Sequence, residues 1–209
     1  MATDELASAP LTEAEWKTMS ELMVELRKIE RSDLFVPVAR LQLLYLLNRI
    51  EQTNEDSEDE LNKLRKFARG RAYNVAAFTW PGWDDMGPIS PDIQELGLSA
   101  ARVTLELATQ ANDVTFNALW INGAHELNAK NFDSAIKFFE RTRDIAEAAD
   151  GRNMATTWIE LCRYLVDPTK ETQSNLEVAV STLRAEDEEN GDFFAKQIET
   201  ARDVYTRDK

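Results

Sequence analysis

Two stretches of the chain repeat one another at a fixed spacing, and this repeat constrains the fold more than any other feature. Trp120 and Trp158 lie 38 positions apart. The same offset relates small and apolar residues around them: Ala108 and Ala146, Ala111 and Ala149, Ile121 and Ile159, Leu127 and Leu165. A period of this length indicates a unit that cannot bury its apolar face alone and stacks on copies of itself. We therefore expect an array of stacked units, an architecture that usually serves as a scaffold.

The composition suits one helical domain or a short array. A chain of 209 residues is long enough to bury a substantial core. Seven glycines and six prolines leave little material for a turn-rich β architecture. The formal charge of −14 argues against bulk attraction to nucleic acid or to an anionic membrane. One basic stripe follows the acidic run 55–60, and we interpret it as a solvated helix face: Lys63, Arg65, Lys66, Arg69 and Arg71.

Cysteine usage and the first residues point to a cytoplasmic protein. Cys162 is the single cysteine, so no disulfide can form within the chain, which fits a reducing compartment. Residues 1–10 are acidic and polar, lack the pattern of a secretion signal, and are predicted to be a disordered lead-in. The longest dense apolar stretch, 41–47, is too short to span a bilayer.

Helix signals occur along the whole chain. Thr12 and Glu15 form a capping box, after which apolar residues recur at helical spacing. Pro37 suits the first turn of a second helix, where its missing N–H has no intrahelical partner to lose. Residues 41–50 of that helix are apolar on nearly every side, so we expect it to be the most buried element.

The pattern predicts an all-α fold of about nine helices. Ser90-Pro91 has the composition of an N-cap followed by a proline in the first turn. No stretch shows sustained alternation with a period of two. One helix is expected from the capping box at Thr12 to about Ile29 and a second from about Pro37 to at least Ile50. Further helices are expected at about 57–78, 90–111, 113–129, 131–149, 152–166, 171–187 and 191–206.

Residues 119–146 resemble a tetratricopeptide repeat. Gly123 occupies the small position on the first helix, Asn131-Phe132-Asp133 occupies the turn, and Ala135 and Phe139 match the second helix. The segment 145–151 resembles the extended second helix of a common variant. Three positions depart from the pattern: Asn122, Glu126 and Thr142. The resemblance covers about 61–187, with one good unit and a degenerate unit on either side.

The resemblance implies a right-handed α-solenoid whose first helices line a concave groove for peptides or partner proteins. It places an N-terminal helical hairpin at 11–55, three helix pairs at 57–187, and a capping helix at 191–206, within one domain at 11–209. Some members clamp a C-terminal carboxylate with basic residues on the first helices. The helices around Trp120 and Trp158 lack that basic pair, so such a clamp is not predicted.

Catalytic and metal motifs are not evident. His125-Glu126 begins like a zinc-protease motif, but Ala129 stands where the second histidine is needed and the chain has no other histidine. There is no Gly-x-Ser-x-Gly elbow and no glycine-rich phosphate loop. Cys162 lies among apolar residues, where a packed and inert thiol is expected. We therefore predict no catalytic residue, no metal and no cofactor.

The segment 79–88 carries two tryptophans and is longer than most helix connections. In one interpretation Trp80 and Trp83 fold back and plug the space between the first pair and the N-terminal hairpin. In the other they form pocket walls, with Asp84 or Asp85 and His125 as polar contacts. Trp120 on the groove-facing helix completes the candidate binding residues.

Taken together, the sequence predicts a non-catalytic scaffold that binds a protein or peptide in the groove. The alternative is a regulatory protein that binds a small molecule beside the Trp80–Trp83 loop. An enzyme built on the same helices is a third possibility, which would need titratable residues converging in a cleft. Homodimerisation through a terminal helix is compatible with the pattern.

Overall fold

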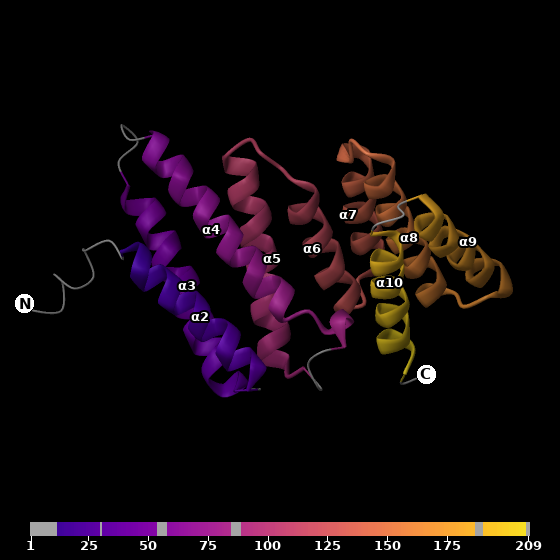
Figure 1. The fold of residues 1–209 in the computed structure, drawn as a ribbon, viewed down its shortest axis with the longest axis horizontal. Coiled ribbons are helices and arrows are strands. Elements are labelled where there is room, and N and C mark those ends of the chain that lie inside the picture. Colours follow the sequence, from indigo (N-terminus) through magenta and orange to yellow (C-terminus); the bar gives the residue numbers. More distant parts are fainter. Residues whose placement is uncertain (1–11, 30, 54–57, 85–88, 187–189, 208–209) are drawn as a thin grey trace, which may run out of the picture. The chain divides into compact units, whose positions relative to one another are not determined.

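The computed structural model describes residues 12–29, 31–53, 58–84, 89–186 and 190–207. Over these residues the chain forms nine α-helices and one 3₁₀ turn, and it forms no strand (Figure 1). The all-α prediction is therefore confirmed for the described part of the chain. The structure divides into two compact units, Met1–Gln42 and Leu43–Lys209, with the boundary inside one helix.

The first unit contains α2 (Glu13–Lys28) and the beginning of α3 (Ser32–Gln52). The predicted capping box is present: the Glu15 N–H donates to the Thr12 hydroxyl, and the Glu15 carboxylate accepts from the Thr12 N–H at 2.6 Å. Met23 and Leu26 are buried on α2, as are Phe35 and Ala39 on α3. The spacing of these apolar residues is helical, so one face of each helix is covered.

Two expectations about α3 are wrong. The helix begins at Ser32, so Pro37 lies in its second turn and not its first. A proline there removes one helical hydrogen bond, and the burial of Phe35 on the same helix offsets that loss. Nor is α3 buried on every side, because Leu41 is 66% exposed and Leu44 is 59% exposed. A run of apolar residues shows which side chains a helix could bury. Their actual burial depends on how many other helices pack against it.

The second unit is a series of helices in which each contacts the next along the chain (Figure 1). Ser90 caps α5 as predicted, accepting a hydrogen bond from the Ile93 N–H. The observed bounds agree with the predicted ones to within a few residues in most cases. The elements are α4 (Glu58–Phe78), η2 (Pro81–Trp83), α5 (Pro91–Gln110), α6 (Phe116–Asn128), α7 (Phe132–Ile145), α8 (Ala149–Val166), α9 (Lys170–Glu186) and α10 (Gly191–Thr206).

The predicted extended helix over 131–149 is wrong, because α7 ends at Ile145 and α8 starts at Ala149. Ala146 is extended, and its carbonyl accepts a hydrogen bond from the Arg152 guanidinium at 2.9 Å. Gly151 permits this close turn, since a Cβ there would lie 3.2 Å from the Ala146 side chain.

The most buried element is α6, in which every residue from Ala118 to Leu127 is buried. The two polar residues that depart from the repeat pattern are paired there. Asn122 donates to the carbonyls of Ala101 and Ala118 at 2.7 and 2.8 Å. Glu126 accepts from the Asn131 side chain at 2.8 Å. Because buried polar groups need partners, these bonds make the departures compatible with a buried helix.

The closest approach of α6 to α7 is at Gly123. A Cβ at this position would lie 2.7 Å from the Phe139 ring, which is fully buried. The small residue and the aromatic ring therefore fit together as the resemblance implies for one unit.

The helix at 191–206, expected to cap the end of the array, contacts α9 and also α8 and η2. Its first residue packs closely against the end of α9, since a Cβ on Gly191 would lie 2.6 Å from the Leu183 carbonyl oxygen. Ala195, Ile198 and Ala201 are its buried apolar residues. The helix therefore turns back along the inner helices in addition to covering the last one.

Replacing Gly123 with alanine should destabilise the second unit. Overpacking against Phe139 costs about 1–3 kcal/mol, and the better helix propensity of alanine offsets about 1 kcal/mol of it. Gly70→Ala is the control, because nothing lies within 4 Å of a Cβ at Gly70; it should stabilise by about 0.5–1 kcal/mol. Urea unfolding measures both changes, and equal stability of the two variants would contradict the close crossing.

Candidate functional site

Trp80 is the centre of an aromatic cluster that joins the loop after α4 to α6 and α8. Its side chain is completely buried. Its ring makes edge contacts with Trp83, Trp120 and Trp158 at centroid distances of 4.8, 5.6 and 5.5 Å. Its indole N–H donates to the Ala124 carbonyl at 3.0 Å. Trp80 is therefore a packed core residue whose contacts are with α6 and α8, whereas the plug interpretation placed it against the N-terminal hairpin.

The repeat in the sequence places Trp120 and Trp158 together. Each lies eight residues before the last residue of its helix, α6 or α8. Both side chains are buried, and their rings are 5.9 Å apart. The two indoles thus occupy corresponding places on successive first helices, and Trp80 contacts both.

The described part of the loop contains one 3₁₀ turn, Pro81–Trp83. Gly82 lies directly on the Trp80 ring, where a Cβ would come within 2.2 Å. Trp83 is half-buried and donates its indole N–H to the Ala77 carbonyl at 2.9 Å. Asp84 then adopts a left-handed conformation with φ of 55°. Asp85, a second candidate contact, lies outside the described residues.

An ion pair connects this loop to the end of α10. The Arg207 guanidinium donates two hydrogen bonds to the Asp84 carboxylate, at 2.8 and 2.5 Å. These bonds hold the pKa of Asp84 below its usual range. Near by, burial raises the pKa of Tyr205, whose side chain lies close to Trp80. The loop and α10 therefore close one side of the site together.

His125 connects two first helices. It is 1% exposed, and its Nε2 lies 2.9 Å from the Ala76 carbonyl oxygen on α4. Burial lowers the pKa of His125 to about 4, so the ring is neutral and Nε2 donates. Gly97 makes room for the ring, since a Cβ there would lie 2.3 Å from His125 Cε1. The histidine is thus a packed residue at a junction of helices.

A pocket of about 290 Å³ lies beside the tryptophan loop. Trp83 and Trp120, two of the predicted residues, line it, whereas Trp80 and His125 lie behind its wall. The Trp120 indole N–H is buried without a hydrogen-bond partner. That N–H is covered by protein atoms, so the pocket offers aromatic walls and not this donor. Its remaining lining residues are Tyr73, Phe116, Asn117, Asp150, Gly151, Met154, Phe194 and Gln197.

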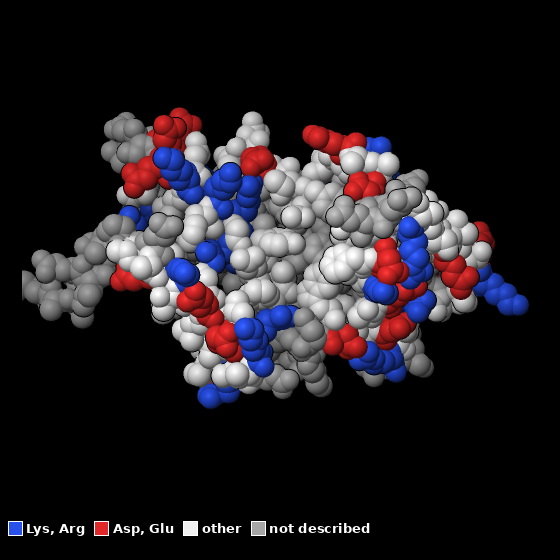
Figure 2. Space-filling view, viewed as in Figure 1, with Lys and Arg blue, Asp and Glu red and all other residues white. Residues whose placement is uncertain are grey.

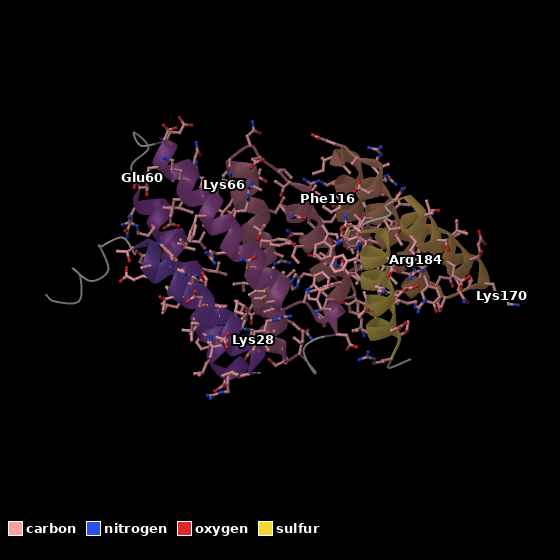
Figure 3. All side chains as sticks on the ribbon, in the orientation of Figure 1. Lys28, Glu60, Lys66, Phe116, Lys170 and Arg184 are labelled. Carbon is pink, nitrogen blue, oxygen red and sulfur yellow. The ribbon has the colours of Figure 1, made fainter. Side chains whose placement is uncertain are left out.

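A second pocket, of about 480 Å³, lies between α4, α5 and the start of α6. Lys66 and Phe116, labelled in Figure 3, mark the α4 side and the α6 side of this region. Tyr73 and Asn117 line both pockets, so the two pockets adjoin each other, and we refer to the pair as the groove. The other lining residues are Phe67, Arg69, Gly70, Arg71, Asn74, Thr104, Thr115 and Ala118.

The groove brings together residues that the sequence analysis did not single out. Part of the stripe interpreted as a solvated face, including Lys66 and Arg71, lines the second pocket. Uncharged side chains gather over α5 and α6 in the middle of Figure 2, with basic side chains over α4 beside them. The sequence did contain one sign of this pocket, which is Gly70 within the basic run. A glycine in the middle of a helix lowers helix propensity, so its presence there calls for a structural explanation.

The titratable groups of the described residues do not form a catalytic or metal-binding cluster. Cys162 is buried, and burial raises the pKa of its thiol well above the usual value. Within the described ranges no three His, Cys, Asp or Glu side chains gather as metal ligands would. None of the described helices has both the length and the hydropathy needed to cross a membrane.

We compared the chain with models of protein families, with curated proteins and with solved structures, and none of them matches it. The resemblance to tetratricopeptide repeats therefore stays a prediction. What the groove binds is inferred below from its own geometry.

Trp80→Ala should destabilise the second unit by about 3–5 kcal/mol, because it empties a fully buried site and removes the hydrogen bond to the Ala124 carbonyl. Trp83→Ala should cost less, below about 2 kcal/mol, since Trp83 is half-buried. Denaturant unfolding followed by far-ultraviolet circular dichroism compares them. If Trp83→Ala lowered the free energy of unfolding more than Trp80→Ala, then Trp83 and not Trp80 would be the residue that anchors the loop.

His125 should make the protein sensitive to acid. The unfolded chain takes up the histidine proton near pH 6.5, whereas the folded protein does so near pH 4. Its contribution to stability is therefore complete above pH 6.5 and declines, by on the order of 3 kcal/mol, as the pH falls to about 4. Unfolding free energies between pH 7 and 4 for the wild type and His125→Gln should diverge in slope; parallel curves would refute a buried neutral imidazole.

Proposed function

We propose that the protein is a non-catalytic scaffold that binds an extended segment of a partner protein along the groove. The observation that carries this proposal is that two pockets lie side by side and share Tyr73 and Asn117 as lining residues. This surface lies on α4, α6 and α8, the first helices of the predicted pairs. The resemblance implies peptide binding on the same helices.

A peptide suits the groove better than a small molecule does. A small ligand would fill the aromatic pocket beside Trp83 and leave the larger neighbouring pocket empty. An extended chain advances about 3.3 Å per residue and presents alternate side chains to one surface, so it can occupy both. The aromatic end supplies apolar contact area, and Asn74 and Asn117 supply amide groups for the peptide backbone.

The wall of the groove at its aromatic end depends on contacts within the chain. Phe194 of α10 and Trp83 both line the aromatic pocket. The ion pair between Asp84 and Arg207 holds these two elements together. A binding surface with a wall already in place loses less conformational entropy when the ligand binds.

Photo-crosslinking in the cells that naturally make the protein tests this function. A photoreactive residue in place of Asn74, which is exposed within the groove, should crosslink to a partner polypeptide. The same residue in place of Lys137, exposed on α7, is the control and should not. Adding Gly70→Leu should fill the larger pocket without disturbing the helix and remove the crosslink at position 74.

Crosslinks that form equally at both positions, or that survive Gly70→Leu, would count against the groove as the docking surface. Far-ultraviolet circular dichroism and urea unfolding establish that Gly70→Leu is folded, so that loss of the crosslink reports on the pocket.

A further inference from the structure

We propose that the groove selects an acidic segment that also carries an aromatic side chain. The carboxylates would lie against Lys66 and Arg71, and the aromatic ring would enter the aromatic pocket that Trp83, Trp120 and Phe194 line. This inference rests on the proposed function and names the chemistry of its ligand.

The larger pocket has a local excess of positive charge. Lys66, Arg69 and Arg71 line it, and no acidic side chain does. Arg69 is engaged by Asp113, donating to its carbonyl and its carboxylate at 2.8 Å. Among the described residues, neither Lys66 nor Arg71 has a carboxylate partner in a salt bridge. Two cations therefore remain for a ligand.

Arg71 is held in a fixed place. Its guanidinium lies 4.8 Å from the centre of the Phe67 ring, and its side chain is half-buried. Burial lowers the pKa of Arg71, and the group remains charged at neutral pH. A planar guanidinium fixed over a ring is already ordered to donate two parallel hydrogen bonds to a carboxylate.

The start of α6 adds to the positive potential of this pocket. Thr115 caps the helix by accepting from the Ala118 N–H. The N–H groups of Phe116 and Asn117 belong to the first turn and have no intrahelical acceptor. The helix dipole therefore places partial positive charge at the wall formed by Thr115, Asn117 and Ala118.

The overall charge of −14 does not outweigh these local charges. At physiological ionic strength, charges separated by more than about 8 Å are largely screened in solvent. A carboxylate in the pocket would contact Lys66 and Arg71 at much shorter range than it would the distant acidic helix ends. The charges that line the pocket therefore decide which ligand is preferred there.

The glycine in the middle of α4 fits the same ligand. Gly70 lies in the middle of α4 with nothing within 4 Å of a Cβ, so packing does not require a glycine. Its lack of a side chain keeps the larger pocket open.

Isothermal titration calorimetry with short synthetic peptides tests the inference. The reference peptide has acidic residues on both sides of one phenylalanine, and both ends are capped so that only side-chain charges act. Three comparison peptides carry asparagine and glutamine in place of the acids, lysine in place of the acids, or alanine in place of the phenylalanine. The reference peptide should bind on the order of tenfold more tightly than each of them.

Matched variants locate the binding. Lys66→Gln with Arg71→Gln should weaken binding of the reference peptide on the order of tenfold and reduce its salt dependence. Lys137→Gln with Arg141→Gln is the control, because it removes the same charges from α7, where Arg141 lies over the Phe138 ring at 5.9 Å. That control should leave the affinity unchanged. Gly70→Leu should abolish binding.

The outcomes separate this inference from the proposed function. If the asparagine–glutamine peptide binds as tightly as the reference and Gly70→Leu still blocks it, the preference for acids is refuted while the groove remains a peptide site. If the control pair weakens binding as much as the pair on α4, the site is misplaced. If no peptide shows a dependence on Gly70, both the ligand chemistry and the peptide-binding function are wrong.

Discussion

The second unit depends on one buried indole. Trp80 fills the space that the loop after α4 would otherwise leave between α6 and α8, and its N–H bond to Ala124 fixes its orientation. An indole buries more apolar area than any aliphatic side chain, so its position sets how closely these helices approach. Position 82 requires a glycine, because any Cβ there would overlap the Trp80 ring. Trp80 and Gly82 of the connection are therefore part of the core.

The groove is a consequence of that arrangement. With Trp80 buried, Trp83 is left at the surface of the cluster, where Phe194 of α10 forms the other side of an aromatic pocket. The two tryptophans of the loop thus differ in role, because Trp80 packs against α6 and α8 and Trp83 lines a cavity. His125 joins α4 to α6 behind the wall and keeps the first helices in register. Rigid helices beneath the site reduce the ordering that a ligand must impose.

Helix content and most boundaries could be predicted, since capping residues and helical spacing act locally. Ser90 and Thr12 show this directly. The exposure of α3 could not be predicted, because burial depends on neighbours far along the chain. For the site, the sequence indicated Trp83 and Trp120 as lining residues. It did not indicate Tyr73, since a half-buried aromatic on a helix has the same pattern as a core residue. The pairing of Asp84 with Arg207 spans 123 positions and leaves no local signal.

The crowding of indoles gives the molecule a distinctive optical behaviour. Four of the five tryptophans lie in one cluster, whereas Trp16 belongs to the first unit. Rings with centroids 4.8–5.9 Å apart couple electronically, so near-ultraviolet dichroism and emission will be dominated by their mutual geometry. A separation of the helices that carry them would change these spectra before much helix is lost. The chain thus contains its own reporter of whether those helices are still assembled.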